Sequence, residues 1–456
     1  MKYRFAIPFA TPNWLLYGSL GVSVAAIYRL GYLTPRSHFA ELLAWFALAF
    51  LAYFLQNRSK LTLKQGLTLA VFLRLVLLFA TPAFSDDYFR FLWDGHLLHN
   101  GLNPFLSLPS TWMESGQPLP AGLSSDLYKG LNSSHYYSVY PPVAQAIFWF
   151  STWWAKSTFS SLIIMRLCLL LAEVGTLWLL PKLLDKLKLP ARQALWYALN
   201  PAIILELTGN LHFEAVMIFF LAAALYVLVS NQWKLAAVLF GLSVGSKLVP
   251  LLLLPLLPRF LGWRRAIGFG LLVALMLGLL FSPFLSKDLL LHFGSSLNLY
   301  FQKFEFNASV YYLLRALGSW AAGFNLIAFI GPALSFLTLL GALWLGFFYQ
   351  RERQDWKWLL FCSLALFTLY LLLATIVHPW YISTLVALGT CTRYRYPMVW
   401  SGAAVLSYAA YQNAAYKENL WLIALEYAII LGFMVWEIWK SQKTQLAIDT
   451  KATTSI

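Results

Sequence analysis

The sequence predicts an all-α polytopic membrane protein. Hydrophobic residues make up 60% of the 456 residues and charged residues only 11%, so the chain has too little polar side chain to cover a globule in water. The aromatic fraction of 17% is typical of proteins with aromatic belts at the bilayer interfaces. Long runs of Leu, Ala and Val provide the roughly 20 apolar residues that each helical crossing needs. These runs lack the alternation of transmembrane strands, which favours a helical bundle over a barrel.

The apolar segments follow one another along most of the chain and predict about twelve to fourteen crossings. The first, from about Trp14 to Leu33, has no small-residue cleavage site and is followed by further spans, so we interpret it as a retained anchor. We treat residues 1–456 as a single integral-membrane domain in which residues 1–64 form additional N-terminal helices. The predicted segments are 12–30, 38–55, 65–84, 141–157, 161–181, 192–209, 213–230, 234–258, 266–282, 323–348, 358–376, 380–392, 397–411 and 420–439.

The basic residues lie in short clusters between the apolar segments rather than on one face of an element. The formal net charge of +15 therefore does not indicate nucleic-acid binding, and the positive-inside rule predicts that these clusters face the cytoplasm. The external side then receives a long polar loop at 85–140, a second loop at 283–308, and the turns that contain "GNLHFE" and "HPWY". The clusters are Arg58, Lys60 and Lys64; Lys182, Lys186, Lys188 and Arg192; Arg259, Arg264 and Arg265; Arg351, Arg353 and Lys357; and Arg393 and Arg395.

Two apolar segments do not fit a simple alternation of crossings. Only an odd number of crossings can separate an external 85–140 from an internal 182–192, yet both 141–157 and 161–181 are apolar. We expect 141–157, which opens with "YPP" and contains "STWWAKS", to lie along the interface or to be re-entrant. Segment 234–258 contains "GSKLVP", which predicts two short half-helices that meet at Lys247. Broken helices at membrane depth occur where they line a cavity.

The stretch "SDDYFRFLWDG" places charged residues directly after an apolar segment. Ser85 is expected to cap a short helix on which Asp87, Arg90 and Asp94 share one face, with Asp86 one turn from Arg90. This helix would hold two carboxylates near the membrane surface. In the structural alternative the aspartates cap the helix and pair with Arg90, which suits Asp94 better than the adjacent pair, because neighbouring carboxylates repel each other.

Other charged, imidazole and aromatic residues lie at the predicted external edges, where burial is costly and function is the default reading. Each has a structural alternative: His212 and Glu214 would form an interfacial turn, and His378 would begin a helix. Trp380 would belong to an aromatic belt, and Lys247 would extend its ammonium to the interface. These candidates are His212, Glu214, Lys247, Glu305, His378 and Trp380.

The motifs "SDDYFRFLWDG", "GLNPF", "YPPVAQ", "ALNPAIILELTGNLHFEAV", "SKLVPLLLLP" and "HPWY" resemble, in their order and spacing, bacterial membrane glycosyltransferases of the GT-C superfamily that are mannosyltransferase-like. The resemblance extends from about Ser85 to Glu426. It implies a multi-pass enzyme of the bacterial inner membrane that moves a sugar, most simply mannose, from a polyprenyl-phosphate donor to a lipid or glycan acceptor on the external face, with inversion. In that superfamily an acidic residue of the first long external loop is the proposed base, which corresponds here to Asp86 or Asp87. The superfamily loop follows the first span, whereas two extra apolar segments precede it here.

The chemistry of such a transfer also follows from the residues themselves. Attack on the anomeric carbon needs a base for the acceptor hydroxyl and a cation for the departing phosphate. We expect Asp86 to be the base, because it lies nearest the end of the preceding span, and Asp87 to support it. Candidates for the phosphate are Lys247, Arg90 and His378. The residues expected to bind the donor phosphate or the substrate are Arg90, Asp94, His212, Glu214, Lys247, Glu305, His378 and Trp380.

A single carboxylate acting in a one-step displacement predicts inversion, whereas Glu214 or Glu305 could supply the second carboxylate that retention needs. No glycine-rich phosphate loop is visible, which favours a lipid-linked donor over a nucleotide sugar. We predict no cofactor. A divalent metal held by the aspartates stays an alternative, although no ligand cluster with a recognisable spacing supports it.

Two other classes of function compete with the enzyme. A secondary transporter or lipid-linked sugar flippase would also use broken helices and a lysine such as Lys247, but the hydropathy shows no internal repeat and the most polar external piece is a long loop. A scaffold would not need paired aspartates. We therefore rank the enzyme first, with membrane lipids and the two lipid-linked or glycan substrates as its partners.

Overall fold

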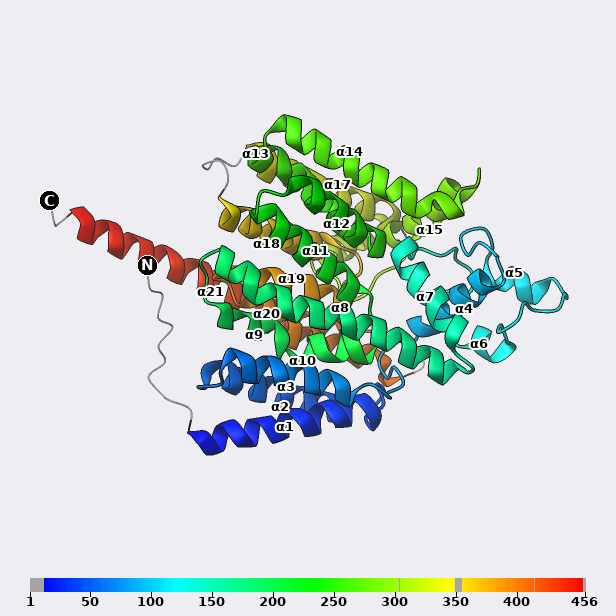
Figure 1. The fold of residues 1–456 in the computed structure, drawn as a ribbon, viewed down its shortest axis with the longest axis horizontal. Coiled ribbons are helices and arrows are strands. Elements are labelled where there is room, and N and C mark those ends of the chain that lie inside the picture. The colour runs from blue at the N-terminus through cyan, green and yellow to red at the C-terminus, as the bar shows by residue number, and fades with distance from the viewer. Residues whose placement is uncertain (1–11, 303, 349–354, 414, 454–456) are drawn as a thin grey trace.

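The computed structural model describes residues 12–302, 304–348, 355–413 and 415–453. Within these residues the chain is built from helices and contains no strand beyond an isolated bridge between Phe306 and Ile376. Most helices run side by side along the long axis of the molecule (Figure 1). The all-α membrane class expected from the composition is confirmed.

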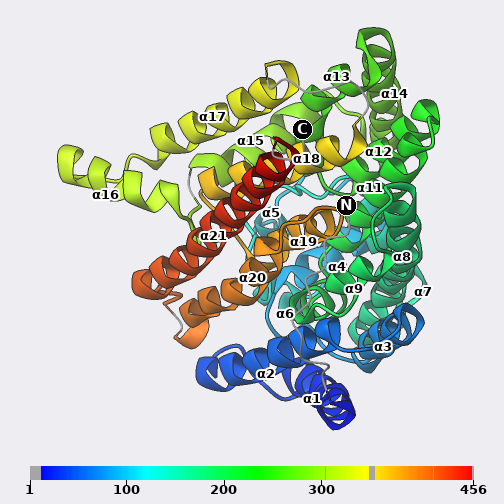
Figure 2. The same ribbon diagram turned by 90° about the vertical axis from the view of Figure 1, so that its left-hand side faces the viewer.

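The first part of the chain supplies three outer helices and then the polar loop. In Figure 2, α1, α2 and α3 form one side of the bundle. The elements are α1 (Asn13–Tyr32), α2 (Phe39–Arg58), α3 (Leu63–Val76), α4 (Asp87–His99), α5 (Pro109–Glu114), α6 (Ser125–Lys129), α7 (Pro142–Trp154), α8 (Thr158–Lys186), η1 (Ala191–Ala194), α9 (Leu195–Ala198), α10 (Pro201–Ile203), the π-helix η2 (Ile204–Gly209), α11 (Glu214–Val229) and α12 (Trp233–Ser246).

The second part forms the opposite side and the C-terminal helices. The helices α14, α16 and α17 lie across the bundle from α1 (Figure 2). The elements are η3 (Val249–Leu256), α13 (Leu257–Leu261), α14 (Trp263–Phe281), η4 (Ser282–Phe284), α15 (Leu289–Gln302), α16 (Val310–Ala322), α17 (Ile327–Phe347), α18 (Trp356–Leu373), η5 (Pro379–Tyr381), α19 (Ile382–Thr390), α20 (Tyr396–Ala403), η6 (Ala404–Gln412) and α21 (Leu420–Thr453).

Each predicted apolar segment forms helix, but fewer helices than expected are long enough to cross a membrane unaided. In the described residues six helices meet both the length and the hydropathy that a crossing requires, or up to seven if the bent pair Pro201–Gly209 and Glu214–Val229 counts as one span. The expectation of twelve to fourteen crossings is therefore not met by this measure. The physical reason is that several segments are broken, as at Lys247, or form short helices such as α3 and α12.

The two ends of the bundle differ in character. Helices α4, α5 and α6 extend from one end, and the last turns of α21 extend from the other (Figure 1). We call the first the loop end, made of residues 33–38, 77–141, 210–213, 304–309, 374–381, 411–413 and 415–419. At the other, basic end, Arg192 donates hydrogen bonds to the carbonyls of Asn57 and Leu61, so two predicted basic clusters meet.

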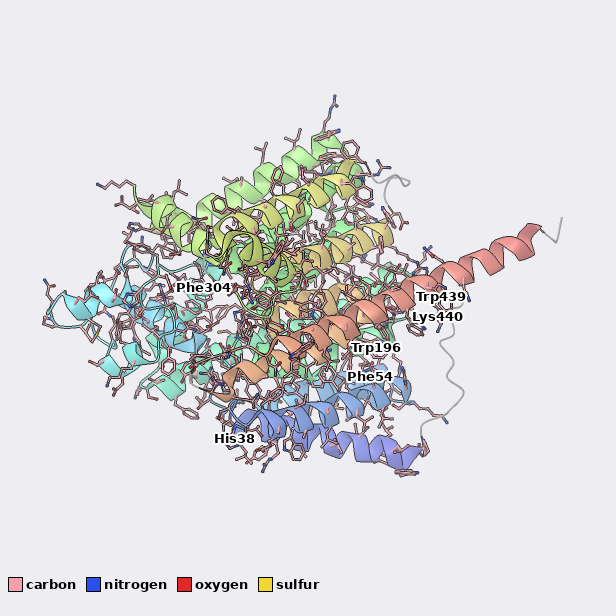
Figure 3. All side chains as sticks on the ribbon, turned by 180° about the vertical axis from the view of Figure 1, so that it is seen from behind. His38, Phe54, Trp196, Phe304, Trp439 and Lys440 are labelled. Atoms are coloured by element: carbon pink, nitrogen blue, oxygen red, sulfur yellow. The ribbon has the colours of Figure 1, made fainter. Side chains whose placement is uncertain are left out.

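The basic end also carries the remaining predicted basic clusters that the structure describes. Arg395 lies 5.7 Å from the ring of Trp196, and Figure 3 shows Trp196 on the same side of the molecule as Trp439 and Lys440, with Phe304 and His38 toward the loop end. Arg351 and Arg353 lie outside the described residues.

Of the two segments that did not fit a simple alternation of crossings, one is a short helix and the other is interrupted. Helix α7 has 13 residues, or about 20 Å of helix, and packs on α4 through a stacked pair of rings, Phe91 and Phe148, at 4.7 Å. This short helix is consistent with a segment that does not cross. The predicted break at Lys247 is confirmed, since α12 ends at Ser246, Lys247 is extended, and η3 begins at Val249.

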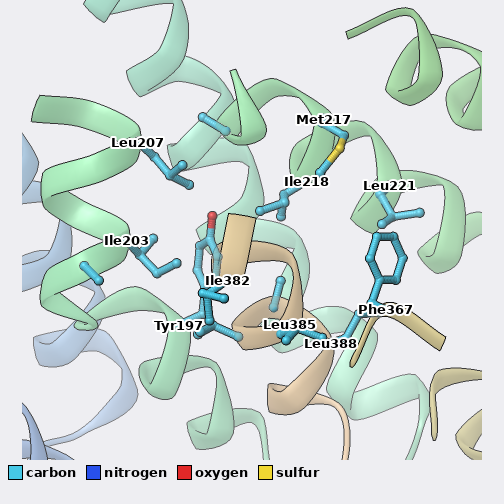
Figure 4. Packing of buried hydrophobic residues seen from close by; sticks show 14 of the residues in the cluster. Tyr197, Ile203, Leu207, Met217, Ile218, Leu221, Phe367, Ile382, Leu385 and Leu388 are labelled. Carbon is cyan, nitrogen blue, oxygen red and sulfur yellow. The ribbon is translucent and has the colours of Figure 1, made fainter. Parts of the chain in front are cut away.

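The core includes buried residues of η2, α11, α18 and α19, among them Leu207, Met217, Phe367 and Leu385 (Figure 4). Buried charges in this core are paired or hydrogen-bonded, as their desolvation requires. Arg74 binds Glu173 at 2.7 Å. Arg166 donates to the carbonyls of Leu78, Thr208 and Gly209 at 2.9–3.0 Å, which ties the end of η2 to the segment that leads into α4.

Candidate active site

The start of α4 presents two adjacent carboxylates in different surroundings. Asp86 is the N-cap residue of α4, and its Oδ2 accepts a hydrogen bond from Arg36 Nη2 at 2.5 Å. Its side chain is 35% exposed, and Oδ1 accepts no hydrogen bond from another described residue. Arg36 comes from the connection between α1 and α2, so the N-terminal helices contribute directly to this region.

Asp87 faces another direction, as expected for neighbouring positions on a helix. Its Oδ1 accepts a hydrogen bond from Asn132 Nδ2 at 3.0 Å. The helix begins one residue later than predicted: Ser85 Oγ accepts from the Asp87 amide at 3.2 Å, but Asp86 occupies the N-cap position and turns its side chain to Arg36 instead of the first turn.

Arg90 and Asp94 lie one turn further along α4 and are buried. Asp94 accepts from Arg90 Nε at 2.8 Å, from Ser138 Oγ at 2.5 Å and from Gln145 Nε2 at 2.9 Å. Arg90 also donates to the carbonyl of Tyr136 at 2.8 Å. The pair therefore holds the loop before α7 against α4. This is the structural role, pairing with Arg90, that the sequence analysis gave as the alternative for Asp94.

A stack of rings connects two of the predicted turns. Trp380 lies between His212, at 3.8 Å between centroids, and His378, at 4.3 Å. Phe306 contacts the other side of His378 at 4.9 Å. The backbone positions these rings. Leu211, next to His212, has a positive φ of 62°. The backbone of Phe306 forms hydrogen bonds with the backbone of Thr375 and Val377, next to His378.

Lys247 lies beside the same stack. Its extended backbone between two half-helices points the ammonium at Glu214 Oε1, with which it forms an ion pair. The ammonium is also 4.8 Å from the ring centroid of Tyr381. The Lys247 side chain is 27% exposed, whereas that of Glu214 is 3% exposed and its Oε2 has no hydrogen-bond partner among the described residues.

Glu305 does not join this group. Its carboxylate accepts from Arg315 Nη1 and Tyr311 Oη, both at 2.6 Å, so it holds α16 against the loop. The neighbouring residue in sequence, Phe306, is the one that contacts His378.

The electrostatics of the stack favour a neutral imidazole. Burial lowers the pKa of His378 to about 3; the nearby charge of Asp87 opposes this change, and His212 and Lys247 add to it. His378 is therefore uncharged at neutral pH and can accept or donate a hydrogen bond but not supply a fixed positive charge. Of the cations in this region, Arg36 pairs with Asp86, and Lys247 pairs with Glu214 and acts on His378.

Three functional candidates come from the structure rather than from the sequence. They are Arg36, which binds Asp86; Glu206, whose Oε2 is 3.3 Å from His212 Nδ1 and whose Oε1 accepts from Tyr408 Oη; and Tyr411, over whose ring Arg36 lies at 4.8 Å. Glu206 lies within the quoted motif "ALNPAIILELTGNLHFEAV", and a lone carboxylate in an apolar run is a signal that could have identified it. Arg36 carried no such signal.

Among the described residues no group of three or more His, Cys, Asp and Glu side chains is arranged to hold a metal ion.

Comparison with known proteins bears on this site. Residues 23–263 match the family described as alpha-(1->6)-mannopyranosyltransferase, N-terminal domain. A curated protein of Mycobacterium tuberculosis (strain ATCC 25618 / H37Rv), alpha-(1->6)-mannopyranosyltransferase A, is 24% identical over 186 residues, which are 40% of this chain and 34% of that protein. The chain thus matches about a third of the length of this relative. The family match includes Arg36, Asp86 and Lys247, whereas His378 and Trp380 lie beyond it.

Proposed function

This chain belongs to the alpha-(1->6)-mannopyranosyltransferase family, and from that premise we propose that it transfers a mannosyl unit from a polyprenyl-phosphate-linked donor to a lipid or glycan acceptor. The observation that carries the proposal is that the half-buried carboxylates at the start of α4 and the lysine between two half-helices lie at the same end of the bundle, where the charges of Asp87 and Lys247 both act on His378. The link between them is the stack of His212, Trp380 and His378.

Asp86 is the proposed general base. It takes the proton of the acceptor hydroxyl while the hydroxyl oxygen bonds to the anomeric carbon, and the bond from that carbon to the phosphate oxygen breaks. Asp86 Oδ1 accepts no hydrogen bond from another described residue, whereas Arg36 orients Oδ2. Displacement in one step inverts the anomeric centre.

Lys247 is the proposed partner of the departing phosphate. A compact ammonium acts on a phosphate as a point charge, and preorganised charge is the main source of stabilisation where negative charge develops. Glu214 keeps Lys247 in place before the donor binds. Both faces of Trp380 are covered by imidazoles, so Trp380 is proposed to hold His212 and His378 in place beside the donor.

Asp87, His378, His212 and Glu214 complete the proposed site around the donor. The charge of Asp87 acts on His378, so the two lie near each other across the gap between α4 and η5. Arg90 and Asp94 are proposed to position α4, and Glu305 to position the loop at 304–309.

The proposed location of the loop end is the external face of the bacterial inner membrane, because the positive-inside rule assigns the basic end to the cytoplasm. A secondary transporter or flippase is not favoured by the family to which the chain belongs. No cofactor is proposed.

Purified protein in detergent provides the test. Polyprenyl-phosphate mannose and octyl α-mannopyranoside should yield a dimannoside, and NMR should show the anomeric configuration inverted relative to the donor. GDP-mannose as sole donor should give no product, and a parallel reaction with a chelator tests the divalent-metal alternative. No transfer from the lipid-linked donor by folded protein would refute the proposed donor.

A further inference from the structure

A cavity of about 610 Å³ lies beside the proposed base and includes none of the site residues predicted from the sequence. Three segments form it: residues 31–37 at and after the end of α1, residues 79 and 81–83 before α4, and residues 411–413 and 416 at and after the end of η6. Arg36 lines this cavity and also binds Asp86, so the cavity and the carboxylate are one side chain apart. Its volume is in the range of about 300–1,000 Å³ that small-molecule sites occupy.

The lining has the chemistry of a carbohydrate site. Tyr411 and Tyr416 meet edge to face at 5.6 Å, and Tyr416 is 56% exposed. The exposed side chains of Ser37, Thr81 and Asn413 make no hydrogen bond to another described residue, so their hydroxyl and amide groups are available to a ligand. Aromatic faces cover the apolar face of a pyranose, and hydroxyl and amide groups pair with its hydroxyls.

The charge of the lining argues against a phosphate. Arg36 is the only charged residue among the described residues that line the cavity, and its charge is matched by Asp86 at 2.5 Å. A lipid phosphate would have to compete with Asp86 for this one cation, whereas a neutral hexose needs no counter-charge.

We propose that this cavity binds a neutral mannose unit of the acceptor glycan and that Arg36 is the positioning residue between this subsite and Asp86. The inference rests on the proposed function, which it deepens by assigning the acceptor to the N-terminal side of α4. A sugar held here lies on the same side of Asp86 as Arg36, while the donor site of Lys247 lies beyond the ring stack. The N-terminal helices thereby gain a role, since their connection supplies one wall.

Two variants test the subsite with octyl 6-O-α-mannopyranosyl-α-mannopyranoside as the acceptor probe. Asn413→Ala removes an amide, and Tyr416→Asn removes a ring with a residue that tolerates the positive φ of 49° at this position. Each should raise the acceptor KM roughly 5- to 20-fold, the effect of a lost hydrogen bond or ring contact, while the KM for polyprenyl-phosphate mannose stays at the parent value. Gln117→Ala, an exposed change at the loop end outside the cavity, is the matched control and should leave both constants unchanged.

Binding without turnover separates this inference from the proposed function. Titration of donor-free protein with the same dimannoside should show binding that both variants weaken by similar factors. If the parent binds the dimannoside in this way but transfers no mannose, the subsite stands and the proposed reaction fails. If transfer occurs and neither variant changes the acceptor KM or binding, or if they raise only the donor KM, the acceptor subsite is overturned. Unchanged melting temperatures of the variants exclude misfolding as the cause.

Discussion

Single side chains decide which carboxylate at the loop end is available for chemistry. Asp94 has every oxygen engaged by Arg90, Ser138 or Gln145, whereas Asp86 shares only Oδ2, with Arg36. A carboxylate that is oriented on one oxygen and open on the other suits a general base, because the open oxygen can reach the acceptor hydroxyl. At this scale the assignment of Asp86 and Asp87 can be tested one residue at a time.

Asp86→Asn keeps the shape of the side chain and removes its basicity. We expect the rate of mannosyl transfer to fall by roughly 10²- to 10⁴-fold, the usual loss for a general base, with donor affinity near that of the parent. Asp87→Asn should reduce the rate less and should weaken donor binding. Initial rates and donor titrations provide the measurements. If Asp87→Asn alone abolishes turnover the roles are exchanged, and a double Asn variant at the parent rate would exclude a carboxylate base.

Lys247→Met should weaken binding of polyprenyl-phosphate mannose by roughly 1.5–3 kcal/mol, typical of a lost charge-assisted contact. Lys247→Arg should restore only part of the donor affinity, because a planar guanidinium does not replace a compact ammonium. The single change also strands the buried carboxylate of Glu214. The double variant Lys247→Met with Glu214→Gln removes that complication and should fold well yet still bind donor weakly. Parent-like donor affinity in the double variant would remove Lys247 from the phosphate site.

At the scale of elements, interruptions in helices place the site. The break between α12 and η3 exposes Lys247, and the turn between η2 and α11 turns the chain by 113° and brings His212 to Trp380. Interrupted helices leave backbone groups without helical partners, which must be satisfied inside a membrane protein. Arg166 satisfies carbonyls at the end of η2 and in the segment before α4.

Arg166→Met leaves the carbonyls of Leu78, Thr208 and Gly209 without this donor. Because buried unsatisfied groups cost about 1–3 kcal/mol each, we expect a loss of stability of roughly 3–5 kcal/mol and a large fall in the melting temperature in detergent. Arg166→Lys should be intermediate, since one ammonium cannot reach all three carbonyls. Arg264→Met, at an exposed position of α14, should have little effect. An unchanged melting temperature in Arg166→Met would show that η2 needs no such anchor.

The turn before η5 should make stability depend on pH. The folded-state pKa of His378 is lowered to about 3 by burial, below the value of about 6.5 in an unfolded chain, so between these values the unfolded chain binds the extra proton. The contribution of His378 to the free energy of unfolding is thus fully present above about pH 6.5 and falls, by at most about 1.4 kcal/mol per pH unit, as the pH decreases toward 3. Between about pH 4 and about pH 7, the melting temperature of His378→Asn should change less with pH than that of the parent. Equal slopes would contradict the lowered pKa.

At the scale of the whole molecule, the bundle separates two chemically different ends. Helices α4, α5 and α6 lie at the loop end, and the last turns of α21 lie at the other (Figure 1). The carboxylates of α4, the ring stack and the cavity belong to segments of the loop end, and the described basic clusters belong to segments of the basic end. This separation is what a fixed orientation in a membrane requires, because cytoplasmic loops retain Lys and Arg.

Cysteine labelling tests the orientation. The side-chain oxygen of Ser133 is buried, so Gln117→Cys, at an exposed position of the long loop, is the better probe in a variant without Cys168, Cys362 and Cys391. We expect Gln117→Cys to react with an impermeant maleimide in intact cells. Asp185→Cys, exposed at the basic end, should react only after permeabilisation. The reverse pattern would place the loop end in the cytoplasm.

The helical membrane class, the positions of the apolar segments and the break at Lys247 could be derived from the sequence by itself. Each depends on local properties: the hydropathy of about 20 consecutive residues, or a lysine a few residues before a proline within an apolar run. The carboxylates of α4, Lys247, His378 and Trp380 could be selected as candidates for the same reason, since a polar or aromatic side chain at the edge of an apolar segment is visible without knowledge of its partner. The pairing of Arg90 with Asp94 could also be predicted from the sequence, because their spacing places them on one face of a helix.

Partners and distances were decided only by the tertiary structure. Asp86 binds Arg36 across 50 positions of sequence, and Asp94 binds Ser138 and Gln145 across 44 and 51; no local pattern relates such residues. The sequence also does not show that Phe306, rather than its neighbour Glu305, contacts His378. The backbone bridge between Phe306 and Ile376 determines this contact. The packing of the short helix α7 on α4 through Phe91 and Phe148 was likewise visible only in the tertiary structure. Hydropathy records which surfaces avoid water, whereas the pairing of those surfaces follows from shape and hydrogen bonding between segments that are far apart in the chain.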